Sequence, residues 1–234
     1  MRRRRSVQHH QHSLKSLQAV VLGKDGVGKS ALTVRMLTRR FIGEYDVSLE
    51  ATYRHHTVID GQFVSLAIMD TAGKNSRDKM DTCLTFGELF FIVYSTTDRT
   101  SFDEARLLVK YIQQDKTIQS SPYLIAIVAT KKDLKHLRQV EEYEGRFLAQ
   151  DVDGLFYQVS ISEGYEEVQK MLEEVLRACL NREKNKGSST LSKMKEGIMV
   201  KTKSLRRKST SDSTPAEQIR PTTLGQNTSP VSVT

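Results

Sequence analysis

Residues 17–40 combine three features in an order that restricts the fold of the whole chain. The apolar run Leu17–Leu22 precedes the glycine-rich segment Gly23–Ser30, and apolar residues at helical spacing follow over Ser30–Arg40. The glycine-rich segment reads GKDGVGKS and fits the pattern G-x-x-x-x-G-K-[ST]. The backbone N–H groups of such a loop face inward, and the helix that follows directs its positive end toward them. The sequence therefore predicts a phosphate-binding loop between a buried strand and a helix.

Two side chains of this loop carry the chemistry that a nucleotide site needs. The ammonium group of Lys29 can reach β- and γ-phosphates, and the hydroxyl group of Ser30 can bind Mg²⁺. The alternative interpretation is a chance glycine-rich turn. The strand before the loop and the helix after it favour the phosphate site.

The rest of segment 16–186 alternates strand-like and helix-like stretches. Further strands are predicted over Tyr53–Ile59, Phe63–Met69, Leu89–Tyr94, Tyr123–Ala129 and Phe156–Ser160. Further helices are predicted over Phe102–Gln114, Glu141–Gln150 and Tyr165–Lys186. Asp60-Gly61, between the second and third strands, is a hairpin signal. We expect an α/β fold of the P-loop NTPase type, with a mostly parallel six-stranded sheet, helices on both faces and one antiparallel edge strand.

The net charge of +8 is concentrated at the two ends of the 234-residue chain. Residues 1–15 hold five basic residues and no acidic residue, and residues 187–234 hold eight basic and three acidic residues. Residues 16–186 hold 23 basic and 25 acidic residues and are nearly neutral. Segment 187–234 is rich in Ser and Thr and too poor in apolar residues to offset its ordering entropy. We expect one folded domain, 16–186, between a basic disordered arm, 1–15, and a basic disordered tail, 187–234.

The composition also excludes several classes of protein. Two cysteines, Cys83 and Cys179, cannot form a disulfide framework, which favours a reducing compartment. The longest apolar runs are much shorter than the ~20 residues of a membrane-spanning helix. Polar residues, His9–His12, stand where a secretory signal needs an apolar stretch. We therefore expect a cytoplasmic protein, with a nuclear location or transient contact with membrane surfaces as alternatives.

Polar residues also follow the third strand, at the edge of the sheet where ligands bind in such folds. The segment Asp70-Thr71-Ala72-Gly73 stands there. The Asp70 carboxylate can hold the water shell of the same Mg²⁺, and the Gly73 N–H can meet a γ-phosphate. An Asp before a turn is common, so this segment is a weak signal by itself.

The segment Thr130-Lys131-Lys132-Asp133 closes the fifth strand at the same edge. The Asp133 carboxylate can accept two hydrogen bonds from guanine, from N1–H and from the exocyclic amine. Adenine has no N1–H and would leave the carboxylate unpaired, at a cost of several kcal/mol for a buried charge. Ser160 and Ile161, after the last strand, can support the base through main-chain contacts.

Taken together, these motifs resemble the Ras family of small GTPases over about residues 16–186. The resemblance rests on segments in the expected order, namely GKDGVGKSALT (Gly23–Thr33), RFIGEYDVSLEATYRH (Arg40–His55), DTAG (Asp70–Gly73), TKKD (Thr130–Asp133) and VSISE (Val159–Glu163). The second and last segments most resemble the RERG and Ras-like-eleven branch, which lacks a lipid anchor. The resemblance implies a G domain that binds GTP or GDP with Mg²⁺ and acts as a signalling switch.

The resemblance also implies roles for residues outside the phosphate loop. Phe41 would stack on the guanine, although it can also be a plain core residue. Ser48 would join Mg²⁺ when a γ-phosphate is present, although it can also be an ordinary loop hydroxyl. Asp46–Tyr53 would be the first switch and the edge that effector proteins bind, and the second switch would begin at Lys74. An exchange factor is a further candidate partner, and a monomer is the default oligomeric state.

The candidate residues fall into three sets. The nucleotide-binding set is Asp25, Gly26, Val27, Gly28, Lys29, Ser30, Ala31, Phe41, Ser48, Gly73, Thr130, Lys131, Asp133, Ser160 and Ile161. The metal-ligand set is Ser30, Ser48 and Asp70. The catalytic set is Lys29, Gly73 and Lys74.

Three positions depart from the family pattern. Lys74 stands where the family has the Gln that orients the attacking water, and an ammonium group cannot both donate and accept hydrogen bonds. Asp25 stands where Ras has Gly and crowds the space that a partner's arginine would enter. Thr130 replaces the Asn that ties the base loop to the phosphate loop. We expect slow GTP hydrolysis, weak stimulation by activators and fast nucleotide exchange.

The tail carries further candidate signals. The chain ends Val231–Thr234 without a cysteine, so we expect no prenyl anchor, and Met1-Arg2 argues against myristoylation. The basic cluster within Lys201–Lys208 is interpreted first as a solvated tail, with nuclear import and weak contact with an anionic surface as alternatives. Ser209 follows this cluster and resembles a site for basophilic kinases. A phosphate there would add about −1.5 to −2 charge and weaken any anionic contact.

Three functions therefore compete. The first is a GTP-dependent signalling switch, and the second is a nucleotide-binding interaction module that does not hydrolyse GTP. The third is a nucleic-acid-associated protein that works through its basic ends. Nothing in the nearly neutral segment 16–186 favours the third.

Overall fold

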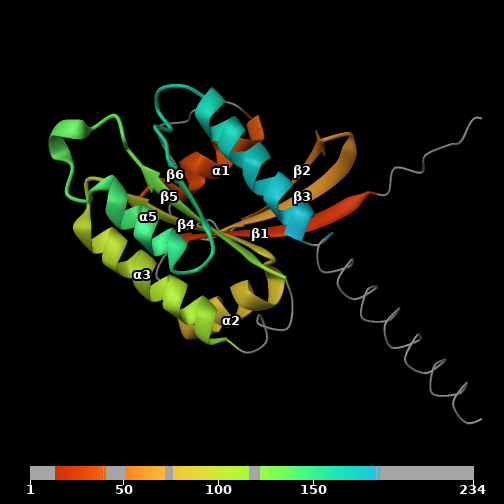
Figure 1. Ribbon diagram of the computed structural model, residues 1–234, viewed down its shortest axis with the longest axis horizontal. Coiled ribbons are helices and arrows are strands. Elements are labelled where there is room, and N and C mark those ends of the chain that lie inside the picture. Colours follow the sequence, from red (N-terminus) through yellow and green to blue (C-terminus); the bar gives the residue numbers. More distant parts are fainter. Residues whose placement is uncertain are drawn as a thin grey trace, which may run out of the picture. The chain divides into compact units, whose positions relative to one another are not determined.

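The computed structural model describes residues 14–38, 40, 51–71, 76–115, 122–182 and 184. A six-stranded sheet with the strand order β2-β3-β1-β4-β5-β6 forms its centre (Figure 1). The strands are β1 (Lys15–Gly23), β2 (Ala51–Ile59), β3 (Gln62–Asp70), β4 (Leu89–Ser95), β5 (Leu124–Thr130) and β6 (Leu155–Gln158). Every neighbouring pair is parallel except β2 and β3. The predicted mostly parallel sheet with one antiparallel edge strand is confirmed.

The antiparallel pair is closed by the two-residue turn Asp60-Gly61. Their φ angles are 50° and 79°, and Ile59 pairs with Gln62. Positive φ at both central residues gives a type I′ turn, whose twist matches the right-handed twist of the flanking strands. The hairpin expected from Asp60-Gly61 is therefore present at the expected residues.

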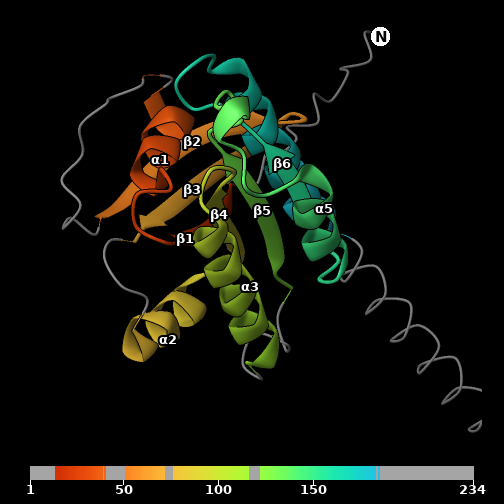
Figure 2. The ribbon, with the colours of Figure 1, turned by 90° about the vertical axis from the view of Figure 1, so that its left-hand side faces the viewer.

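Helices cover both faces of the sheet (Figure 2). On one face lie α1 (Lys29–Thr38) and the C-terminal helix, residues 166–182, whose apolar side chains share one buried cluster. On the other face lie α2 (Arg77–Phe86), α3 (Arg99–Gln114) and α5 (Glu142–Gln150), which share a second cluster. A short 3-10 helix, η1 (Lys135–Leu137), follows β5.

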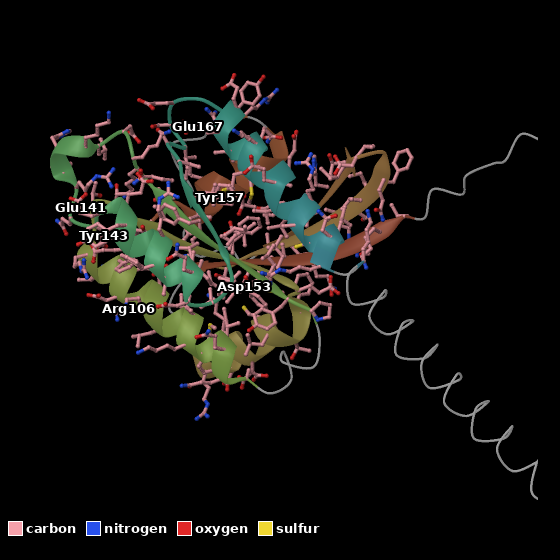
Figure 3. The ribbon with its side chains drawn as sticks, in the orientation of Figure 1. Arg106, Glu141, Tyr143, Asp153, Tyr157 and Glu167 are labelled. Atoms are coloured by element: carbon pink, nitrogen blue, oxygen red, sulfur yellow. The ribbon has the colours of Figure 1, made fainter. Side chains whose placement is uncertain are left out.

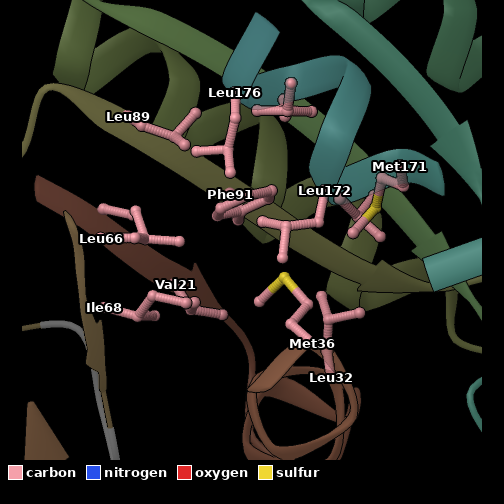
Figure 4. Close-up of a cluster of buried hydrophobic side chains, with 14 of the residues drawn as sticks. Val21, Leu32, Met36, Leu66, Ile68, Leu89, Phe91, Met171, Leu172 and Leu176 are labelled. Atoms are coloured by element: carbon pink, nitrogen blue, oxygen red, sulfur yellow. The ribbon is translucent and has the colours of Figure 1, made fainter. Parts of the chain in front are cut away.

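The two clusters arise because successive side chains of a strand point to opposite faces. In β1, Ala19 and Val21 belong to the cluster under α1 and the C-terminal helix, whereas Val20 and Leu22 belong to the cluster under α2, α3 and α5. Figure 4 shows the first cluster, in which Val21 lies among side chains from α1, β3, β4 and the C-terminal helix. A strand buried on both faces reads as an unbroken apolar run, which explains why β1, β4 and β5 stand out in the sequence.

The start of α3 lies one turn before the expected position at Phe102. Asp98 is its N-cap, and its side chain accepts hydrogen bonds from the backbone N–H groups of Thr100 and Ser101. The buried residues of α3 include Phe102, Ala105 and Val109, whereas Arg106 points to solvent (Figure 3). Apolar spacing locates the buried stripe of a helix but not its polar first turn, which is set by the cap.

Helix α2 is absent from the pattern-based prediction. Three of its ten residues, Met80, Cys83 and Leu84, are buried, and this stripe is too short to stand out as helical periodicity. The helix begins after Ser76, whose side chain accepts a hydrogen bond from Lys79 N. Its position beside α3 follows from packing against the sheet.

Other boundaries differ by small amounts. β6 ends at Gln158, two residues before the predicted end, and the predicted helix Tyr165–Lys186 is helical over residues 166–182 and at 184. The expected arm and tail lie mostly outside the described residues, so the domain boundaries at 16 and 186 stay predictions. Within the described part of the chain, no helix has both the length and the apolarity needed to cross a bilayer.

Candidate nucleotide site

Three loops that follow parallel strands meet at one edge of the sheet. They are the phosphate loop, Gly23–Ser30 after β1, the base loop, Thr130–Asp133 after β5, and the segment 159–163 after β6. The Thr130 hydroxyl donates a hydrogen bond to Val27 O at 2.7 Å, and Lys131 Nζ donates to Gly26 O at 3.0 Å. Predicted phosphate-binding and base-binding residues are thus directly connected.

The backbone of the phosphate loop requires its glycines. Gly23, Gly26 and Gly28 have φ angles of 151°, 77° and 101°. A Cβ on Gly23 would lie 2.2 Å from Val93 O of the neighbouring strand, so no side chain fits there. Val27 is buried and anchors the loop in the core beside Ala31 of α1.

Lys29 is buried, and its ammonium group lies against the inside of this loop. Lys29 Nζ donates to Gly23 O at 2.9 Å and to Lys24 O at 3.0 Å, and it lies 3.3 Å from Asp25 Oδ1. Burial lowers the pKa of Lys29, and the Asp25 carboxylate partly opposes this shift. A cation is therefore present where the sequence predicts phosphates.

Asp70 ends β3 beside the start of α1, and its side chain is 3% exposed. The Ser30 hydroxyl hydrogen-bonds the Asp70 carboxyl, and burial raises the pKa of Asp70 against this bond and the charge of Lys29. Among the described residues, Asp70 Oδ1 has no hydrogen-bond partner. The hydroxyl of the next residue, Thr71, donates a hydrogen bond to Val21 O of β1 at 2.7 Å.

The Asp70 and Ser30 oxygens fit a magnesium ion. A buried carboxylate oxygen without a partner costs free energy of folding. A divalent cation would bind its lone pairs and would lower the raised pKa of the carboxyl group. Mg²⁺ prefers oxygen ligands and commonly uses one or two protein groups together with phosphate oxygens and waters. The structure therefore brings together two of the three expected metal ligands.

The base loop is held by its first two residues. Thr130 is fully buried, and its hydroxyl lies 2.7 Å from Val27 O and 3.0 Å from Tyr94 O. One hydroxyl has a single hydrogen to share between these carbonyl groups, whereas an amide has two. Lys131 has a φ angle of 58°, which turns the chain so that its ammonium reaches Gly26 O.

Asp133 presents the second buried acceptor of the site. Asp133 Oδ2 accepts a hydrogen bond from Ser162 Oγ at 3.5 Å, whereas Asp133 Oδ1 is buried and has no partner within the described residues. A carboxylate with an unused buried oxygen suits a ligand that brings N–H donors, as guanine does.

Ser160 and Ile161 form the wall beside the base loop. Both are buried, and Ser160 Oγ lies 3.2 Å from Ser162 Oγ and accepts from Glu163 N at 3.4 Å. Ile161 Cδ1 would lie 3.2 Å from a Cβ on Gly28, so the side chain packs on the phosphate loop. These two residues therefore connect the two loops.

Three hydrogen bonds at the site were not predicted from the sequence. Lys24 Nζ donates to Asp98 Oδ2 at 2.9 Å and also to Thr100 Oγ1, which ties the phosphate loop to the first turn of α3. Arg35 Nη2 of α1 donates to Glu163 O at 3.0 Å. Asp98 before the helical run is an N-cap signal and would have placed the start of α3, but its contact with Lys24 depends on the tertiary structure.

Several predicted residues lie outside the described part of the chain. They are Phe41, Ser48, Gly73 and Lys74, together with Asp46–Glu50 of the proposed effector edge. The remainder of that edge, Ala51–Tyr53, forms the start of β2.

Comparison with known proteins bears on this geometry. The sequence profile of the Ras family matches residues 18–181. The chain is 38% identical over 173 residues to the Homo sapiens Ras-related and estrogen-regulated growth inhibitor, with 74% of this chain and 86% of that protein covered. It is 38% identical over 162 residues to Rattus norvegicus Ras-like protein family member 11A, covering 66% of each. It is 39% identical over 170 residues to Bos taurus Ras-like protein family member 12, covering 72% and 63%.

These matches span the sheet, the phosphate loop and the base loop. The residues that the family profile matches, 18–181, make up most of the chain. The chain belongs to the Ras family of small GTPases.

Proposed function

We propose that this chain binds GTP and GDP together with Mg²⁺ and acts as a nucleotide-dependent signalling switch that hydrolyses GTP slowly. The observation that supports this most directly is the pair of buried carboxylate oxygens, Asp70 Oδ1 and Asp133 Oδ1, which lack partners among the described residues. A cation would satisfy Asp70 Oδ1, and the N–H donors of a ligand would satisfy Asp133 Oδ1. The phosphate loop, which holds Lys29, contacts both regions, through the hydrogen bond of Ser30 to Asp70 and through that of Lys131 to Gly26 O.

The chain's own groups divide the binding of nucleotide between them. The N–H groups of the phosphate loop and Lys29 bind the phosphates, and Asp133 binds the guanine edge with the support of Lys131, Ser160 and Ile161. Ser30, Asp70 and Ser48 would hold Mg²⁺, which neutralises phosphate charge when it is bound.

The switch itself would use residues outside the described part of the chain. GTP orders Ser48 and Gly73 through its γ-phosphate, and hydrolysis releases both segments. An effector protein reads the difference along Asp46–Tyr53. The protein works as a monomer, and contact of its basic ends with anionic surfaces is weak and reversible.

Slow hydrolysis follows from Lys74 and Asp25. An ammonium group at position 74 donates hydrogen bonds but cannot accept one from the attacking water, and the Asp25 side chain crowds the entry of a partner's arginine. Restoring the amide with Lys74→Gln should speed single-turnover GTP hydrolysis by up to about 100-fold, because the water is better aimed. A wild-type rate that equals that of Lys74→Gln would contradict this assignment.

A direct binding experiment tests the proposal as a whole. Equilibrium titration of the purified chain with GDP, GTP and ADP, with Mg²⁺ and with EDTA, should show guanine preference and Mg²⁺ dependence. Asp70→Asn should remove the Mg²⁺ dependence and leave the guanine preference. Equal affinity for guanine and adenine nucleotides would refute the proposal.

A second candidate is a nucleotide-binding interaction module with negligible turnover. It is favoured by Lys74, Asp25 and Thr130, which all depart from the family pattern. The nucleotide that copurifies with the chain separates the two functions. Bound GDP supports the switch, whereas GTP that persists for hours, or an empty site, supports the module.

A further inference from the structure

All three hydrogen-bond donors of the Lys29 ammonium group have acceptors within the phosphate loop itself. Two acceptors are the backbone oxygens Gly23 O and Lys24 O, at 2.9 and 3.0 Å, and the third is Asp25 Oδ1, at 3.3 Å. An ammonium group has three N–H donors and no acceptor. Lys29 therefore has to give up or share a bond before it can bind a phosphate oxygen.

The three acceptors differ in how easily they can move away from Lys29 Nζ. Gly23 O belongs to a backbone that is held by its φ angle and by its close approach to Val93 O. Lys24 is held through its own side chain, which binds Asp98 and Thr100 of α3. The Asp25 side chain is 48% exposed and can rotate away without any movement of the backbone. Asp25 is thus the acceptor that an incoming phosphate would displace.

Displacement does not remove the charge of Asp25 from the site. The carboxylate stays tethered to the loop, one residue after Lys24 and four before Lys29. The ammonium group of the preceding residue, Lys24, is paired with Asp98 at 2.9 Å, and that of Lys131 donates to Gly26 O at 3.0 Å, so each already has a partner other than Asp25. A displaced Asp25 carboxylate therefore faces the phosphates of the nucleotide as a like charge.

We infer that Asp25 is a tethered anion that competes with nucleotide phosphates for Lys29 and thereby lowers the affinity for GTP more than the affinity for GDP. This inference rests on the proposed function, because it presupposes that phosphates bind at Lys29. GTP is affected more than GDP because the Asp25 carboxylate repels the negatively charged phosphates. The penalty grows with the number of phosphate charges near the loop, so it is largest for GTP, smaller for GDP and smallest for GMP.

The test compares two Asp→Asn substitutions in the full chain. Asp25→Asn removes the competing carboxylate, and Asp103→Asn is the matched control. The Asp103 side chain is 55% exposed and pairs with Arg99 of its own helix at 3.8 Å, so its loss changes the net charge equally without changing the contacts of Lys29. Affinities for GMP, GDP and GTP are measured by equilibrium titration with Mg²⁺ at low and high salt.

The expected result is a graded gain for Asp25→Asn. Its affinity for GTP rises about tenfold, its affinity for GDP rises less and its affinity for GMP is unchanged, while Asp103→Asn resembles the wild type. High salt reduces the gain because the carboxylate is partly exposed. Asp25→Ser, which also lacks the charge, should reproduce the gain.

Two results would overturn the inference and leave the proposed function intact. One is an equal effect of Asp25→Asn and Asp103→Asn, which would mean that only net charge matters. The other is the same change for GMP, GDP and GTP, or no change, in both Asp25 variants. If no form of the chain bound any guanine nucleotide, the proposed function would fail and the inference with it.

Discussion

The phosphate loop and the base loop both follow a buried strand, but they differ in whether their charged groups have hydrogen-bond partners. In the phosphate loop, every donor of Lys29 has an acceptor. In the base loop, Asp133 Oδ1 is buried without a partner among the described residues. A saturated cation must exchange partners when a ligand arrives, whereas an unpaired carboxylate gains partners without losing any. Under the proposed function, nucleotide affinity would depend on exchange of partners at Lys29, and base selectivity on the partners that Asp133 gains.

The largest expected effect is on the phosphate side. Lys29→Ala removes the cation of the cradle and should lower the affinity for both GDP and GTP by about 1,000-fold, since charge-assisted hydrogen bonds contribute about 1.5–3 kcal/mol each. Titration with a fluorescent GDP measures the change. Lys170→Ala is the control, because Lys170 is 78% exposed and pairs with Glu174 on the C-terminal helix. Near-normal affinity of Lys29→Ala for GDP and GTP would contradict the proposed role of Lys29 in phosphate binding.

The second effect tests the base side. Asp133→Ala should reduce discrimination between GDP and ADP by about 100-fold, through weaker GDP binding and little change for ADP. Competition of GDP and ADP for the site measures the ratio. If Lys29→Ala altered the same ratio as strongly, the two loops would not divide affinity and selectivity as proposed.

The third effect concerns the bond that joins the two loops. Thr130→Val keeps the shape of the side chain but removes the donor to the carbonyl groups of Val27 and Tyr94. The free energy of unfolding should fall by about 1–3 kcal/mol, and GDP release should quicken. Chemical denaturation and GDP release measure the two outcomes. Thr130→Ser, which keeps the hydroxyl, should stay close to the wild type, and equal stability of the Val and Ser variants would contradict the role of the bond.

The smallest effect concerns the anchor of the phosphate loop on α3. Hydrogen bonds from Lys24 and Thr100 lower the pKa of Asp98 to about 2. A depressed carboxyl pKa stabilises the folded state above the unfolded pKa, near 4, and that stability is lost as pH falls toward 2. Lys24→Ala should therefore lower the free energy of unfolding by less than about 1 kcal/mol at pH 5, because Asp98 is partly exposed.

This small difference should shrink between pH 4 and pH 2 in urea denaturation. Lys170→Ala again supplies the control. A difference between Lys24→Ala and the wild type that is constant across this range would show that Lys24 acts through something other than the Asp98 charge.

Much of the fold was readable from the sequence, and the reasons for the misses are specific. β1, β4 and β5 are apolar runs because both faces of each strand are buried, and Asp60-Gly61 marks the hairpin through its positive φ angles. Helix α2 was missed because only a short stripe of it is buried. Apolar periodicity indicates which residues are buried, so a helix with few buried residues gives no clear pattern.

The residue types alone fix which groups the candidate site can offer. The glycines of Gly23–Ser30 permit a loop that other residues cannot form, and Lys29, Asp70 and Asp133 stand at the ends of their strands or loops whatever else packs around them. The hydrogen-bond partners of these groups are set by the packing of distant segments. This packing directs Lys24 to Asp98 across 74 positions of sequence, brings Thr130 to Val27 and leaves Asp25 as the partner of Lys29. The physical reason is that residue type and local geometry fix what a group can donate or accept, whereas the partner it finds depends on which distant segments pack beside it.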